Sequence, residues 1–177
     1  MTTYAEIRSA LWSWADGYTP NGCDVVFANQ DGPRPALPFV TLLVNVMDNS
    51  DWPRQSSVSD EGIITITQDR DITVSINAFG ANAWDIADGL RRSLDKITVG
   101  WDLARDDLIY VQPLTGINDL SAVVGSGYEQ RAQMDVMFRA AAVDTDDVGL
   151  IENVEGSGDL GDNVPGVVID VQTTIEP

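Results

Sequence analysis

Two neighbouring stretches decide the fold: RDITVSINAFG (residues 70–80) and, after a single alanine, NAWDIADGLRRSL (residues 82–94). Apolar and polar side chains alternate in the first stretch, which is typical of a strand with one buried face. Gly80 ends the strand, and the apolar residues then recur at helical spacing, so we expect a helix over residues 82–97. Because each element has one apolar face, the two must pack on each other or on neighbouring elements.

The other elements are predicted from the same two periodicities. Helical spacing predicts a helix over residues 3–16, and alternation predicts long strands over 39–46 and 128–141. Shorter strands are expected over 25–28, 63–67 and 108–112, with 63–67 joined to 72–78 as a hairpin across residues 68–70. The expected fold is therefore α+β, with a twisted, mixed, mainly antiparallel sheet flanked by two main helices.

The 177 residues are enough for one domain with a substantial core. We expect a single α+β domain over residues 1–155 and an acidic, glycine-containing extension over residues 156–177. The extension ends in VVIDVQTTIEP, which alternates again. This end is either a last strand or an arm that adds to the sheet of a neighbouring subunit.

The charge of the chain is strongly one-sided. It has 28 acidic and 10 basic residues and a formal net charge of −18 at pH 7. Sequence-independent binding of nucleic acid needs a basic surface, so this composition argues against it. The acidity favours solubility, and it bears on function only where the carboxylates face another polyanion.

The single cysteine, Cys23, leaves no partner for an intramolecular disulfide, and we expect a buried, inert thiol. No apolar run approaches the length needed to cross a bilayer, and the first sixteen residues lack the pattern of a signal peptide. These features together predict synthesis in a reducing cytoplasm and no membrane partner.

Catalytic chemistry has little support in this sequence. Histidine is absent, which removes the commonest general base and the commonest metal ligand. Residues 125–127 are not a phosphate-binding loop, because a strand follows them and no lysine does. Residues 144–155 approach a calcium-loop spacing, but Val148 occupies one ligand position and the flanking segments are expected to be strands. We therefore expect no catalytic residue, no cofactor and no bound metal.

Four residues are candidates for a subunit or partner interface. Trp52 and Trp101 lie in or beside predicted loops and are candidate interface anchors, although partial burial within the subunit explains them equally well. Arg131 and Arg139 project from the polar face of strand 128–141. They are candidates for ion pairs across a subunit boundary, and the alternative is an ordinary solvated strand face.

Three segments together resemble the neck or tail-terminator proteins of contractile-tailed bacteriophages. They are LPFVTLLV (37–44), the strand and helix of 70–94, and the strand 128–138 followed by DVGLIENV (147–154). The middle segment, with TVSINAFG and the downstream LRRSL, is the most specific of the three. The likeness lies in core and strand residues, so it bears on fold and assembly rather than on an active site.

The resemblance implies a structural protein of the virion, synthesised in the host cytoplasm. Proteins of this family form a ring, commonly a hexamer, on the last layer of the tail tube. The implied partners are other copies of the chain, the tail tube protein, the sheath protein and the head-completion or connector protein. The ring stops growth of tube and sheath and joins the tail to the head, and DNA passes through its hole without specific binding.

The composition is compatible with that role, because a ring of acidic subunits repels DNA and we expect some carboxylates to line the channel. The main alternative is another virion structural protein, such as a tail tube subunit or a head-completion adaptor. Two remoter alternatives are a hydrolase that uses carboxylates alone and an acidic inhibitor that mimics DNA.

Overall fold

The computed structural model describes residues 3–49 and 51–150, which divide into two compact units. Unit 1 comprises the chain up to Arg54 and residues 67–143, and unit 2 comprises residues 55–66 and the chain from Asp144 onward. The expected domain boundary after residue 155 and the extension 156–177 lie outside the described residues.

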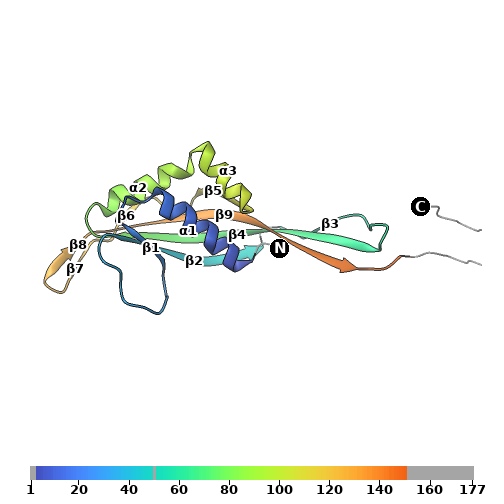
Figure 1. Cartoon of the computed structure of the whole chain (residues 1–177), viewed down its shortest axis with the longest axis horizontal. Helices are drawn as coiled ribbons and strands as arrows, with labels where there is room; N and C mark the ends of the chain where they lie inside the picture. The colour runs from blue at the N-terminus through green and yellow to red at the C-terminus, as the bar shows by residue number, and fades with distance from the viewer. Residues whose placement is uncertain (1–2, 50, 151–177) are drawn as a thin grey trace, which may run out of the picture. The chain divides into compact units, whose positions relative to one another are not determined.

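Unit 1 consists of three helices on one face of a mixed, mostly antiparallel sheet (Figure 1). The helices are α1 (Tyr4–Tyr18), α2 (Ala83–Leu94) and α3 (Ile97–Arg105). The sheet has the strand order β1-β2-β4-β9-β5, and its strands are β1 (Asp24–Phe27), β2 (Phe39–Asn49), β4 (Ile63–Phe79), β9 (Arg131–Asp147) and β5 (Leu108–Pro113). Residues 63–66 of β4 and 144–147 of β9 belong to unit 2. The expected α+β fold is therefore confirmed.

Four shorter strands remain: two complete the sheet and two form a separate hairpin. β3 (Arg54–Gln55) pairs with β4, and β6 (Asn118–Asp119) pairs with β9. β7 (Ala122–Val124) and β8 (Gly127–Glu129) form a two-stranded sheet of their own. β1 is parallel to β2, whereas the pairs β2–β4 and β5–β9 are antiparallel.

The core lies between the helices and the sheet. Alternate residues of β9 are buried, as the period of two predicts, whereas β4 buries Ile72 and every residue from Val74 to Ala78. The apolar stripes of α1 and α2 contribute the helix side of this core. Thr3 caps α1, since its hydroxyl accepts a hydrogen bond from the Glu6 amide while the Glu6 carboxylate accepts one from the Thr3 amide. The ring of Phe138 on β9 contacts both Trp14 and Tyr110 edge to face, with centroid distances of 5.8 and 5.9 Å.

The predicted hairpin between residues 63–67 and 72–78 is wrong, because these residues belong to one continuous strand, β4. Asp71 pairs with Asp48 and Arg70 with Asn49 on β2, so the ladder extends into the expected turn. The segment Gln68–Arg70 contains no glycine or asparagine to favour a turn. In addition, Arg54 forms an ion pair with Asp69 at 3.0 Å.

The helix expected over residues 82–97 ends at Leu94, and a third helix, α3, was not predicted. The amide of Asp95 donates to the carbonyls of Arg92 and Ser93, which tightens the last turn of α2. The next apolar residues, Val99 and Leu103, are four residues apart and are buried on a new helix.

Unit 2, considered by itself, is a small ribbon of extended chain. The Ser56 amide donates to the Thr65 carbonyl at 2.9 Å, and residues 59–62 form the turn between these two positions. The Val148 amide donates to the Gly62 carbonyl at 3.0 Å, which attaches the segment 144–150 to the turn.

Candidate interaction surfaces

The sheet face of unit 1 opposite the helices carries polar side chains joined in a network. Asn45 donates a hydrogen bond to the Ser75 hydroxyl, which donates to the Asp135 carboxylate. Gln133 donates to the same carboxylate at 3.2 Å, and the Asp135 amide donates to the Thr115 hydroxyl at 2.8 Å. Ser75 is only 5% exposed, so its hydrogen bonds compensate for the burial of a polar group.

Arg131, at the start of β9, is held by its own chain. Its Nε and Nη2 atoms donate to Asn77 Oδ1 at 3.3 and 2.8 Å, and its guanidinium lies 5.0 Å from the centre of the Phe79 ring. The sequence could not reveal either partner, because both lie on β4, more than fifty residues earlier.

Arg139, further along β9, forms an ion pair with Asp71 on β4, with 2.7 Å between Nε and Oδ1. This hydrogen bond raises the pKa of Arg139 above its usual value, with smaller contributions from the charges of Asp71, Asp69 and Asp51. The arginine therefore stays charged, and 41% of its side chain remains exposed. Its role at a subunit interface remains a prediction.

The two tryptophans are exposed in different places. Trp52 is 86% exposed, and its amide donates to the Asp51 carboxylate at 2.7 Å. Trp101 lies on α3 rather than in or beside a loop, and it is 64% exposed. Trp101 thus belongs to the helix layer, while Arg131 and Arg139 lie on the opposite face of the sheet, because they alternate along β9 with the buried residues that face the helices. The structure does not gather the four candidates into one surface.

Sequence reasoning missed a set of exposed apolar residues at the end of the sheet formed by β5. α3 packs against β5, and the two elements expose Ile97 and Trp101 on the helix and Ile109 and Val111 on the edge strand. We call these four residues the β5-edge patch. Ile97 and Trp101 are four residues apart on one side of α3, and they are 70% and 64% exposed. The helical spacing of these two residues was the available signal.

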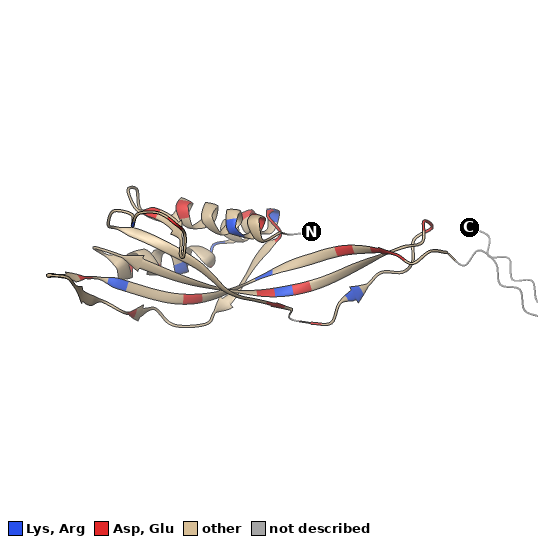
Figure 2. Cartoon of the chain, turned by 90° about the horizontal axis from the view of Figure 1, so that it is seen from below, with Lys and Arg blue, Asp and Glu red and all other residues tan. Residues whose placement is uncertain are grey.

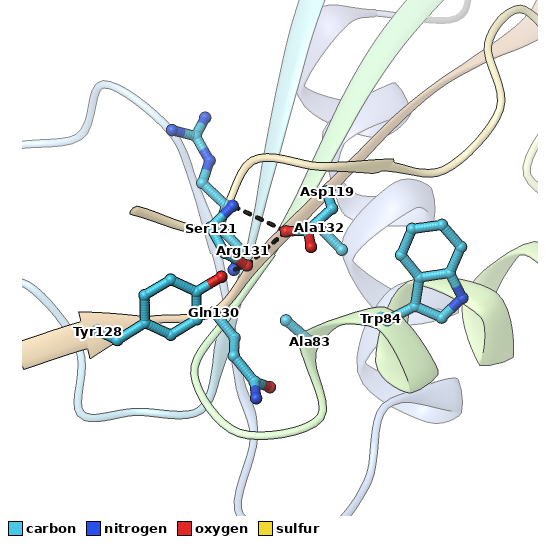
Figure 3. A pocket seen from close by; sticks show the side chains of 8 residues that line it. All are labelled: Ala83, Trp84, Asp119, Ser121, Tyr128, Gln130, Arg131 and Ala132. Carbon is cyan, nitrogen blue, oxygen red and sulfur yellow. Dashed lines mark hydrogen bonds between the residues drawn. The ribbon is translucent and has the colours of Figure 1, made fainter. Parts of the chain in front are cut away.

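A hollow of about 330 Å³ lies near the start of α2 and is drawn in Figure 3. Trp84 and Tyr128 line it together with Asp119, Ser121, Gln130, Arg131 and two alanines. Hydrogen bonds from the hydroxyl and amide of Ser121 hold the pKa of Asp119 below its usual value. Because Asp119 is bound to Ser121 and Arg131 to Asn77, the hollow offers a contact surface rather than a paired acid and base.

Within residues 3–49 and 51–150, no group of three or more acidic or cysteine side chains is arranged to hold a metal ion. Asp144 and Asp146 of the calcium-like spacing lie on β9, and its last positions, Ile151 and Glu155, lie outside the described residues. None of the helices in the described part of the chain is long and apolar enough to span a membrane.

The family model described as phage neck terminator protein matches residues 5–163, which is most of the chain. The chain belongs to this family. The resemblance seen in the sequence is thereby confirmed, and a neck terminator has a tail-terminating structural role in the phage virion. No curated protein matches the chain.

The fold of this neck terminator is similar to a solved structure described as the sheath/tube terminator of PVC, an extracellular contractile injection system, in its extended state. The TM-score is 0.53 and the identity is 9%, so the likeness concerns the fold alone. It covers 92% of this chain and 65% of the other, so this neck terminator spans about two thirds of the longer protein.

Proposed function

We propose that the chain assembles into a closed ring, a homohexamer, on the last layer of the phage tail tube. The ring ends the growth of tube and sheath, and its other side is joined to the head-completion or connector protein. The observation that carries this proposal is the family match over residues 5–163. The fold of the chain, which is similar to that of a sheath/tube terminator, supports it.

The sheet supports a ring because its two ends differ. One end is β1, a four-residue strand parallel to β2, and the other is β5 with the β5-edge patch. A closed ring needs a heterologous interface, in which one surface of a subunit docks on a different surface of the next. In the proposed ring the β5-edge patch, including Trp101, is buried against the neighbouring subunit.

DNA passes through this ring without being held. The chain has an excess of acidic residues, and Arg131 and Arg139 already contact Asn77 and Asp71. Binding of a duplex by release of counterions requires basic side chains that are free to reach phosphates. We propose that carboxylates line the channel, so that their replacement by lysine slows genome ejection in a salt-dependent way. Unchanged ejection kinetics would count against an acidic channel.

The test of the proposed function is the mass of the chain in solution, measured alone and after mixing with assembled tail tubes. The expected result is that the chain adds to tubes in an amount that scales with the number of tube ends, not with tube length. Binding along the whole tube, or no binding to tubes, would overturn the proposal.

A further inference from the structure

Several apolar side chains of unit 2 are exposed to solvent. In its described residues, 55–66 and 144–150, Ile64 is 9% exposed, whereas Val58, Val148 and Leu150 are 49%, 49% and 51% exposed. A two-stranded ribbon by itself is at best marginally stable in water, and packing of its apolar side chains against another surface stabilises it. The exposed side chains therefore indicate a surface that a partner covers.

The ribbon nevertheless has a defined shape. Ser59 holds the turn, since its amide donates to the Ile63 carbonyl at 2.9 Å and its carbonyl accepts from the Gly62 amide at 2.9 Å. Gly62 has a φ of +78°, and a Cβ atom at this position would lie 2.8 Å from the backbone of Gly149. A segment that is shaped before it binds loses less conformational entropy on docking than a disordered one.

The charge of unit 2 indicates what kind of surface covers it. Its described residues include Asp60 and Glu61 at the turn and Asp144, Asp146 and Asp147 on the other segment. Neither residues 55–66 nor the chain after Asp144 contains a lysine or an arginine. Figure 2 shows the acidic positions in red. A second copy of this ribbon would bring like charges together, which disfavours self-docking.

We propose that unit 2 is a docking element for a basic protein surface of the tail assembly. Val58, Val148 and Leu150 supply the apolar contacts, and the surrounding carboxylates pair with lysine and arginine side chains of the partner. Complementary charge at the rim of such an interface mainly increases the association rate and excludes acidic partners. This inference rests on the proposed function in one respect: the partner is assumed to be a protein of the tail assembly.

The test uses the full chain and three purified probes from the same phage: assembled tail tubes, the sheath protein and the head-connector protein. Binding of each probe is measured by interferometry at low and at high salt. The variant Asp60→Lys/Glu61→Lys reverses the charge of the exposed turn, and Asp16→Lys/Asp31→Lys makes the same change at exposed positions of unit 1. The inference predicts a loss of about tenfold or more in affinity for one probe with the first variant only.

Three outcomes would overturn the inference. They are equal losses with both variants, no loss for any probe, and a change in self-association in place of a change in probe binding. Val148→Ser provides a second test, because it removes an apolar contact without changing the charge. It should weaken binding to the same probe. Electron microscopy of tube ends separates the two proposals. If tubes are still capped and the turn variant binds every probe normally, the docking inference fails while the proposed function stands.

Discussion

Trp14 on α1 donates a hydrogen bond from Nε1 to the Ser93 hydroxyl on α2 at 2.9 Å, although the two residues are 79 positions apart. Both side chains are buried, and the Ser93 hydroxyl donates in turn to the Leu90 carbonyl at 2.6 Å. The ring of Trp14 also contacts Phe138 on β9. One hydrogen-bonded pair therefore fixes two helices to each other and to the sheet of unit 1.

Replacement of Ser93 by alanine should destabilise the protein. The buried Nε1–H of Trp14 would lose its acceptor, and an unsatisfied buried donor costs about 1–3 kcal/mol. Urea denaturation followed by tryptophan fluorescence measures the effect. Ser9→Ala, at an exposed position of α1, is the control and should change the free energy of unfolding by less than about 0.5 kcal/mol. Equal stability of the Ser93→Ala protein and the native protein would contradict the assignment.

Two glycines should respond in opposite directions to alanine. Gly80 has a φ of +95°, and a Cβ atom there would lie 3.1 Å from atoms of Leu37 and Pro38, so Gly80→Ala should lower stability by about 1–3 kcal/mol. Gly89 lies within α2 with open space around it, so Gly89→Ala should raise stability by up to about 1 kcal/mol. Thermal unfolding of both variants checks the pair, and a change of the same sign in both would contradict the prediction.

Cys23 should be unreactive in the folded protein. It is 6% exposed, and burial raises the pKa of its thiol, with a smaller contribution from the negative charge of Asp24. A colorimetric thiol reagent should react slowly at neutral pH with the native chain and fully after addition of urea. Rapid labelling of the native protein would show that the thiol is accessible.

The raised pKa of Cys23 predicts that the stability of the protein depends on pH. Because the folded state favours the neutral thiol, its contribution to stability is complete below the usual pKa of a thiol, about 8.5, and is lost as pH rises above that value toward the raised pKa of the folded state. Comparison of the native protein with Cys23→Ala across this range isolates the effect. A difference between them that does not change with pH would contradict it.

Trp101→Ala tests the β5-edge patch. Trp101 is 64% exposed, so its removal should change the free energy of unfolding by less than about 0.5 kcal/mol while weakening ring formation. Trp52→Ala tests the second predicted anchor in the same way, and Leu114→Ala, 43% exposed on unit 1, is the control. If ring formation is the same in all three variants, neither tryptophan anchors the interface.

The sequence predicted those elements in which one periodicity runs uninterrupted. The alternation in β9 and the stripe of α1 identified both elements, because burial of one face dictates the spacing of apolar residues. The continuity of β4 was missed, because its polar middle segment is stabilised by pairing with β2 and by the Arg54–Asp69 ion pair. Those contacts depend on the tertiary fold.

The candidate interface was predicted less well, for a related reason. Polar alternation placed Arg131 and Arg139 on one strand face, but it does not identify neighbours on another strand, such as Asn77 and Asp71. Trp101 was assigned to a loop since α3 was not predicted. The ribbon of unit 2 was missed because the segment before Ile63 is polar and irregular in sequence, and hydrogen bonds of Ser56 and Ser59 determine its shape.

Electron microscopy of tail tubes polymerised with and without this chain tests the central claim most directly. The account predicts shorter tubes that carry a ring-shaped cap at one end, and rings but no long tubes when the chain is incubated alone. Tubes of unchanged length without caps, or long tubes built from this chain by itself, would contradict it.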